Sequence, residues 1–235
     1  NVILGGRTSQ ISFVMETILI LHGWGSSAKN WNKIKESLES QGCKVFIPDL
    51  PGFGENPPLE KPWSIEDYVR WLKEYCKTNN LVQFFLTGHS FGGNIAVQYA
   101  LKFPQDIKKL ILVDPAIVRV KDTRKEIMAK IAKLIKKFSF LPFYSLARRA
   151  FYRFIVKSDY PDTEGPMRET YLKVIKRDFS SSLPNIFVPT VLIWGEEDDI
   201  TPFKYAHLVK EKIAGAKLEI LPGIHHSPQL EAPEL

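Results

Sequence analysis

One serine of this chain stands in a setting that could make it a nucleophile. Ser90 lies within the segment Gly88-His89-Ser90-Phe91-Gly92, between an apolar run typical of a buried strand and a stretch typical of a helix. In this G-x-S-x-G pattern the serine lies on a tight strand-to-helix turn, which presents its hydroxyl above the edge of a sheet. A glycine-rich turn without catalytic function has the same composition, so the pattern is weighed against the rest of the chain.

A serine nucleophile requires a general base and a group that orients the base. His225 and His226 follow the last predicted strand and are the candidate bases. Asp198 and Asp199 follow the strand before it, and Asp114 follows an earlier one, so all three are candidates for the orienting acid. The carboxyl ends of parallel strands meet at one edge of a sheet, where ligands bind. We therefore expect the nucleophile, a histidine and an aspartate to converge there, in the chain order Ser, Asp, His.

Six short apolar runs predict buried strands, and helical patterns separate most of them. The strands are expected near residues 17–21, 44–47, 81–87, 110–113, 191–194 and 218–221. A capping box at Ser64 predicts the start of one helix, and a hairpin is expected within residues 2–14. The alternation of strands and helices predicts an α/β fold, with a mostly parallel sheet and helices on both of its faces.

The alternation is interrupted once, by a basic helical segment between two late strands. Helical patterns run near residues 127–138, 143–154 and 167–179, without a strand among them. Between residues 115 and 185, 16 Lys and Arg stand against 7 Asp and Glu, whereas the whole chain has a net charge of only +6. We interpret residues 119–183 as an all-helical cap over the strand ends, and residues 1–118 and 184–235 as the core domain.

Composition excludes several other classes of protein. No apolar run reaches the ~18 residues that predict a membrane span, and Cys43 and Cys76 lack metal-ligand spacing. The chain has neither a nucleotide-binding glycine loop nor the interleaved basic and aromatic residues of nucleic-acid binders. We therefore predict no cofactor, no metal site, no nucleic-acid partner and no membrane association. Because no secretory signal opens the sequence, a cytoplasmic location is expected; the oligomeric state is not predicted.

Together these motifs resemble those of the α/β-hydrolase superfamily, in particular its small capped esterases and carbon–carbon bond hydrolases. The resemblance covers residues 22–25, 48–54, 88–93, 195–202 and 226–233. It implies the α/β-hydrolase fold with a helical cap. It selects Asp198, three residues after the glycine of the Trp-Gly turn, and His226, five residues before the Glu of a Glu-x-Pro turn. His225 departs from the pattern, because the family usually has glycine there.

The resemblance also implies a role for each residue. Ser90 would attack a carbonyl carbon, His226 would accept the serine proton, and Asp198 would hold the imidazole in the required tautomer. The N–H of Phe91, directly after the nucleophile, would stabilise the oxyanion, and the N–H of Trp24 is the family's second donor. The side chain of Trp24 could equally be only a wall of the pocket.

The leading hypothesis is a cofactor-free serine hydrolase that cleaves carboxylic esters of small to medium size through an acyl-enzyme. Hydrolysis of a carbon–carbon bond in a vinylogous diketone acid is the alternative, because the basic cap would attract an anionic substrate. Two other classes are a lipase-like protein whose basic helix near residues 127–138 lies on a membrane and a non-catalytic binding protein. His22, His89 and Asp49 are expected to brace the loops of the site.

Overall fold

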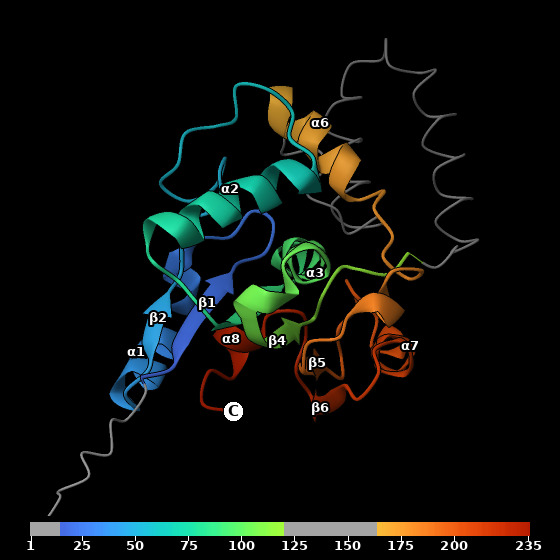
Figure 1. Ribbon diagram of the computed structural model, residues 1–235. Helices are drawn as coiled ribbons and strands as arrows, with labels where there is room; N and C mark the ends of the chain where they lie inside the picture. The colour runs from blue at the N-terminus through green and yellow to red at the C-terminus, as the bar shows by residue number, and fades with distance from the viewer. Residues whose placement is uncertain (1–14, 120–163) are drawn as a thin grey trace, which may run out of the picture.

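The computed structural model describes residues 15–119 and 164–235 (Figure 1). The hairpin predicted within residues 2–14 lies outside the described residues. So do the predicted helices near residues 127–138 and 143–154. The end of the predicted cap, from residue 164 onward, is described.

The described strands form one parallel sheet in the order β2-β1-β3-β4-β5-β6. They are β1 (Thr17–Leu21), β2 (Lys44–Phe46), β3 (Phe84–His89), β4 (Ile107–Val113), β5 (Thr190–Gly195) and β6 (Lys217–Leu221). The chain leaves β1 on one side to form β2 and then returns to form β3 on the other side. The strand order therefore reverses at β1, and open α/β sheets bind their ligands at such a switch point.

Helices cover both faces of the sheet, which confirms the predicted fold class (Figure 1). The described helices are η1 (Ala28–Trp31), α1 (Asn32–Ser40), α2 (Ile65–Thr78), α3 (Phe91–Lys102), η2 (Pro104–Asp106), α6 (Gly165–Val174), η5 (Leu183–Asn185), α7 (Lys204–Lys212) and α8 (Pro228–Glu231). None of these helices is long and apolar enough to cross a membrane. The capping box at Ser64 is confirmed, since its hydroxyl accepts from the N–H of Asp67 while the Asp67 carboxylate accepts from the N–H of Ser64.

Strand β3 begins three residues later than its apolar sequence predicts. Leu81 belongs instead to the end of α2, where its N–H donates to the carbonyl of Cys76 (2.9 Å). Asn80 has a φ of 53° and Gln83 a φ of 51°, so the backbone leaves the extended conformation twice before the strand starts. This is the Schellman ending of a helix, in which a residue in the left-handed region lets the next N–H bond back to the last turn.

The principal core lies between the sheet, α2 and α3. Helix α3 is buried almost all round, and Ile95, Val97 and Tyr99 are fully buried. A smaller cluster on the opposite face packs Trp31 against the sheet. The tight packing of α3 fixes its first turn, which begins at Phe91, directly after Ser90.

Helix α6, at the end of the predicted cap, packs on the same core. Val174 and Phe179 are buried there, and the N–H of Phe179 donates to the carbonyl of Ile117 (2.9 Å). The hydroxyl oxygen of Thr170 accepts a hydrogen bond from the N–H of Trp63 (2.8 Å), which ties α6 to the segment before α2. Residues of α6 therefore lie close to the carboxyl ends of the strands.

Candidate active site

Ser90 occupies a strained turn between β3 and α3. Its backbone angles are φ 49° and ψ −111°, which a non-glycine residue adopts only where the surrounding structure holds it. The Ser90 N–H donates to the carbonyl of Val113 (3.0 Å), and its carbonyl accepts from the N–H of Gly93 (3.0 Å). Strand β4 and helix α3 thus hold the turn that presents the serine hydroxyl.

The two glycines of the pattern are required by close backbone contacts. A Cβ at Gly88 would lie 2.6 Å from the carbonyl oxygen of Gly92, and a Cβ at Gly92 would lie 2.2 Å from the carbonyl oxygen of Leu21. Real Cβ atoms do not approach backbone atoms this closely. The sequence-based expectation that the turn is too tight for larger residues is confirmed.

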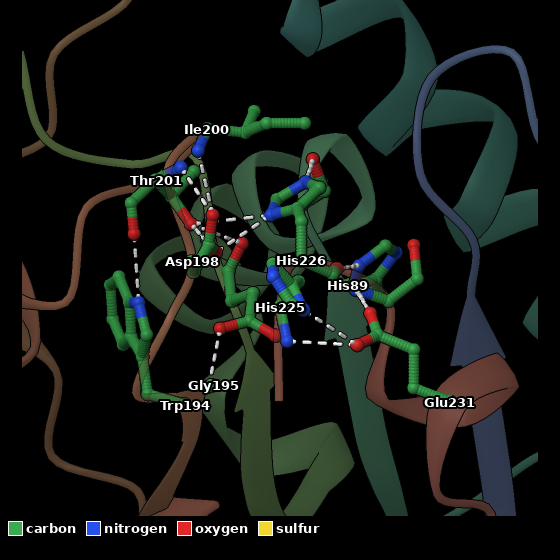
Figure 2. A network of polar contacts seen from close by, with 12 residues as sticks. His89, Trp194, Gly195, Asp198, Ile200, Thr201, His225, His226 and Glu231 are labelled. Atoms are coloured by element: carbon green, nitrogen blue, oxygen red, sulfur yellow. Dashed lines mark hydrogen bonds and ion pairs between the residues drawn. The ribbon is translucent and has the colours of Figure 1, made fainter. Parts of the chain in front are cut away.

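The structure brings Ser90, His226 and Asp198 into one chain of hydrogen bonds. Figure 2 shows its second half, in which His226 points to Asp198. The Nε2 atom of His226 lies 2.9 Å from the Ser90 Oγ, and its Nδ1 lies 2.7 Å from the Asp198 Oδ2. A carboxylate can only accept, so Nδ1 carries the proton and Nε2 is free to accept the serine proton. The neighbouring candidates Asp199 and His225 are both exposed.

Asp198 is buried and surrounded by hydrogen-bond donors. Its Oδ1 accepts from the N–H groups of Ile200 (2.8 Å) and Thr201 (2.9 Å), and its Oδ2 accepts from the Thr201 hydroxyl (2.5 Å). Burial alone would raise the pKa of Asp198, but His226 and the Thr201 donors hold it below its usual value. Asp198 is therefore ionised at neutral pH, as the orienting acid must be.

Thr201 is a residue of the site that the sequence analysis missed. Besides its two bonds to Asp198, its hydroxyl reaches the carbonyl of Asp114 (3.2 Å) and lies 3.5 Å from the His226 Nδ1. Its spacing carried a signal, because Asp side chains often accept from the N–H groups two and three residues ahead. An Asp-x-x-Thr segment directly after a strand is a candidate for that local structure.

Asp114, the alternative orienting acid, has a different place. It is fully buried, its Oδ1 accepts from the N–H of Gly195 (2.9 Å), and its Oδ2 has no hydrogen-bond partner among the described residues. Burial, reinforced by the nearby negative charge of Asp198, raises the pKa of Asp114 to about 8. Asp114 is therefore mostly a neutral acid at neutral pH, and Asp198 is the carboxylate that bonds to His226.

The proposed oxyanion donors lie at the start of α3 and on the loop after β1. Phe91 is the first residue of α3, so its N–H is one of the free donors at a helix N-terminus, where the helix dipole favours negative charge. The Trp24 ring contacts the Phe91 ring, with centroids 5.3 Å apart. Neither N–H donates to another residue in the ranges 15–119 and 164–235.

His22 and Asp49 brace the loop that carries Trp24, as expected. The Nε2 of buried His22 accepts from the N–H of Leu50 (2.9 Å), which leaves Nδ1–H to donate to the Gly23 carbonyl (2.8 Å). Burial lowers the pKa of His22 and keeps the ring neutral. The Asp49 carboxylate accepts from the N–H groups of two further loop residues, Ala28 and Glu55.

His89 braces the segment of the candidate base. Its Nε2 donates to the carbonyl of His226 (2.7 Å), and the two rings lie 5.1 Å apart (Figure 2). Burial, with a smaller contribution from His226, lowers the pKa of His89 to about 3. A neutral His89 therefore holds the backbone of His226 without adding a positive charge beside it.

The described residues contain one group of side chains with metal-ligand chemistry, formed by His89, Asp114 and His226. Their ligand atoms lie within 4.8 Å of one another. However, Nδ1 of His226 bonds to Asp198 and its Nε2 bonds to Ser90. The hydrogen bonds of this group suit proton transfer at the serine better than they suit metal binding.

Aromatic residues form a wall beside the candidate oxyanion site. Trp24 contacts Phe53 (centroids 4.8 Å apart) and Tyr171 of α6 (5.0 Å) in edge-to-face geometry. A Cβ at Gly52 would lie 2.6 Å from the Met167 sulfur, so α6 packs directly on that loop. Trp24, Phe53, Phe91 and Tyr171 thus form one aromatic cluster beside the first residue of α3.

The chain is similar to known proteins in sequence and in fold. The family described as alpha/beta hydrolase fold matches residues 16–135. Lipase 1 of Psychrobacter immobilis is 28% identical over 235 residues, which cover 92% of this chain and 73% of that protein. Pimeloyl-(acyl-carrier protein) methyl ester esterase of Wigglesworthia glossinidia brevipalpis is 29% identical, with 93% and 89% covered. The solved structure of the esterase EaEST from Exiguobacterium antarcticum matches with a TM-score of 0.72 at 22% identity, over 93% of this chain and 88% of that chain.

Proposed function

The chain belongs to the alpha/beta hydrolase fold family, and from this premise we propose that it is a serine hydrolase that cleaves carboxylic esters of small to medium size. The observation that carries the proposal is the hydrogen-bond chain from Ser90 through His226 to Asp198. It supplies a nucleophile, a base and an orienting acid on the fold of the family. Each hydrogen bond in the chain pairs one donor with one acceptor.

The mechanism follows from this geometry. His226 Nε2 takes the proton of the Ser90 hydroxyl as the oxygen attacks the ester carbonyl carbon, and the imidazolium that forms is stabilised by ionised Asp198. The N–H groups of Phe91 and Trp24 stabilise the oxyanion, and each such donor contributes about 10²–10³ in rate. His226 then gives its proton to the leaving alcohol. A water molecule, deprotonated by His226, hydrolyses the acyl-enzyme and restores the serine.

The surroundings of the site support a carboxylic ester as the substrate. The ring contacts of Trp24 with Phe53, Phe91 and Tyr171 offer an apolar wall to the acyl group. Among the proteins to which the chain is similar, one is named a lipase and another a methyl ester esterase. The proposed reaction needs only a small-molecule ester and water, and it requires no cofactor, metal or nucleic acid. We propose a cytoplasmic location.

The decisive test is a fluorophosphonate probe together with a panel of p-nitrophenyl esters of increasing chain length. Wild-type protein is expected to be labelled at Ser90 alone and to hydrolyse the shorter esters. Ser90→Ala should lose activity by a factor of about 10⁶, whereas Ser37→Ala, an exposed serine on α1, should behave as wild type. Labelling at another residue, or full activity of Ser90→Ala, would refute the assignment.

The same panel tests the carbon–carbon bond alternative when an anionic vinylogous diketone acid is assayed beside the esters. Ester hydrolysis is expected to have the higher kcat/KM. Faster cleavage of the diketone acid, still dependent on Ser90, would keep the nucleophile and replace the ester substrate.

A further inference from the structure

Three titratable side chains surround the segment that carries His226, and the proposed mechanism uses none of them. Glu231 lies on α8, His225 directly precedes His226, and Glu197 directly precedes Asp198.

The carboxylate of Glu231 holds the backbone on both sides of His226 (Figure 2). Its Oε2 accepts from the N–H of His225 (2.9 Å), and its Oε1 accepts from the N–H of Ser227 (3.1 Å). Burial opposes the charge of this carboxylate, but these donors and the His225 ring hold the pKa of Glu231 below its usual value. Glu231 is therefore ionised at neutral pH, and hydrogen bonds to an ionised acceptor are the stronger kind.

The His225 ring joins Glu231 to the segment of the orienting acid. Its Nδ1 lies 3.1 Å from the Glu231 Oε2, and its Nε2 lies 3.3 Å from the Glu197 Oε2. A neutral imidazole has one N–H, so both contacts are hydrogen bonds only when the ring is protonated. The side chains of His225 and Glu197 are 58% and 59% exposed, whereas that of Glu231 is 30% exposed. Exposed ion pairs contribute little, so Glu231 has the larger effect.

The segments that carry Asp198 and His226 are also in backbone contact. The N–H of Glu197 donates to the carbonyl of Ile224 (2.9 Å). A Cβ at Gly195 would lie 2.3 Å from the carbonyl oxygen of His225. A shift of the segment that contains His225 therefore changes the position of His226 relative to Asp198.

On the basis of the proposed function, we propose that Glu231 is a positioning residue for the general base. Its carboxylate fixes the backbone of His226 directly and, through His225 and Glu197, links it to the segment of Asp198. The rate of proton transfer from Ser90 is sensitive to small errors in the position of the imidazole.

The test is Glu231→Gln, which keeps the size of the side chain but removes its charge and one of its two acceptor oxygens. The kcat for a p-nitrophenyl ester should fall on the order of tenfold, with KM nearly unchanged. A residue with only a structural role would lower the fraction of folded protein, whereas kcat per fluorophosphonate-labelled site would stay at the wild-type value. Glu196→Gln, in the exposed segment beside Glu197, is the charge-matched control and should leave both measurements at the wild-type values.

The outcomes separate this inference from the proposed function. Wild-type protein that neither hydrolyses esters nor reacts with the fluorophosphonate probe would overturn both. Active wild-type protein together with a Glu231→Gln variant that has the wild-type kcat and KM would overturn the positioning role alone.

A second measurement decides the question if Glu231→Gln is not folded by circular dichroism. His225→Gln, Glu197→Gln and the double variant are compared by the rate of fluorophosphonate labelling at pH 6. Each single change is expected to slow labelling by about two- to threefold, and the double change should slow it no further, because the two residues act as one unit. Additive effects, or equal rates in all four proteins, would overturn the proposed link from Glu231 through His225 and Glu197 to the segment of Asp198.

Discussion

Two buried aspartates lie at neighbouring strand ends of this site, and their surroundings give them different protonation states at neutral pH: Asp198 is ionised and Asp114 is mostly neutral. Asp198 accepts three hydrogen bonds from Ile200 and Thr201 besides its bond to His226, and its pKa is lowered. Asp114 accepts one, from Gly195, and burial raises its pKa to about 8. Environments that push two acids apart in this way commonly assign them different tasks. The charged acid bonds to the base, and the neutral acid holds the backbone at the end of β5.

Replacing each acid by its amide should separate these tasks. Asp198→Asn is expected to lower kcat by a factor of about 10⁴, because the amide no longer holds His226 in the required tautomer. Asp114→Asn replaces an acid that is already neutral, and Asp199→Asn changes an exposed side chain, so both should stay near wild type at pH 7. Ester hydrolysis by the three purified variants is the measurement. An inactive Asp114→Asn variant together with an active Asp198→Asn variant would show that Asp114, not Asp198, is the orienting acid.

The raised pKa of Asp114 also predicts how stability depends on pH. The folded protein keeps the Asp114 proton up to about pH 8, whereas the unfolded chain releases it near 3.8. Between these values the folded state binds one more proton, so this group makes stability fall as pH rises. Asparagine has no proton to lose. We therefore compare the melting temperature of Asp114→Asn with that of wild type. The value for the variant minus the value for wild type should be several degrees higher at pH 8 than at pH 5, at about 2–4 °C per kcal/mol. An equal difference at both pH values would contradict the assignment.

At the scale of elements, the turn at Ser90 depends on contacts that tolerate no side chain at Gly92. The carbonyl oxygen of Leu21 on β1 would lie 2.2 Å from a Cβ there, and neither backbone segment can move without disturbing the sheet. Gly92→Ala should therefore lower the free energy of unfolding by about 3 kcal/mol or more, as overpacking of a rigid core does. Gly42→Ala is the control: it has a φ of 85° but open space around it, so it should cost only about 1–2 kcal/mol of backbone strain. Urea unfolding of both variants measures the difference, and equal costs would contradict the steric argument.

The sequence predicted these elements well where a local pattern determines them. Apolar runs identified the strands, and Ser64 identified the start of α2, because burial and capping depend on nearby residues. The start of β3 was predicted too early, since Leu81 is buried in the core at the end of α2, where its N–H bonds back to Cys76. The hydrogen bonds of Thr201 to Asp198 and of Glu231 around His226 were not predicted. They depend on loop conformations that no periodicity specifies.

At the scale of the whole molecule, the site is assembled from segments that are distant in sequence but adjacent at the switch point of the sheet. Trp24 follows β1 and Ser90 follows β3, the two strands on either side of that point. Parallel topology predicts this convergence without coordinates. It does not distinguish Asp114 from Asp198, because both follow strands that end at the same edge. In the structure their hydrogen bonds separate them, since Asp198 bonds to His226 and Asp114 bonds to the N–H of Gly195.

The packing of the described end of the segment between β4 and β5 determines where the predicted cap can be cut. Its described end belongs to the core: Val174 and Phe179 are buried, and Tyr171 packs on Trp24. Removing residues 118–182, the predicted cap nearly in full, would delete these contacts. Loss of one large buried side chain such as Phe179 costs about 3–5 kcal/mol, a large part of the stability of an ordinary domain. We therefore expect this deletion to prevent folding.

A shorter deletion of residues 120–163, closed by a flexible Gly-Ser linker, retains α6 and every proposed catalytic residue. We expect this variant to fold and to react with the fluorophosphonate probe at Ser90. Turnover of p-nitrophenyl acetate should partly survive, because a small acyl group needs little contact beyond the Trp24 wall. The preference for longer esters should collapse, because we assign the remaining walls of the pocket to residues 120–163. Circular dichroism and probe labelling are the controls for folding and for the nucleophile. A folded variant that neither reacts with the probe nor hydrolyses acetate would show that residues 120–163 position the catalytic groups themselves, and the interpretation as a cap would be wrong.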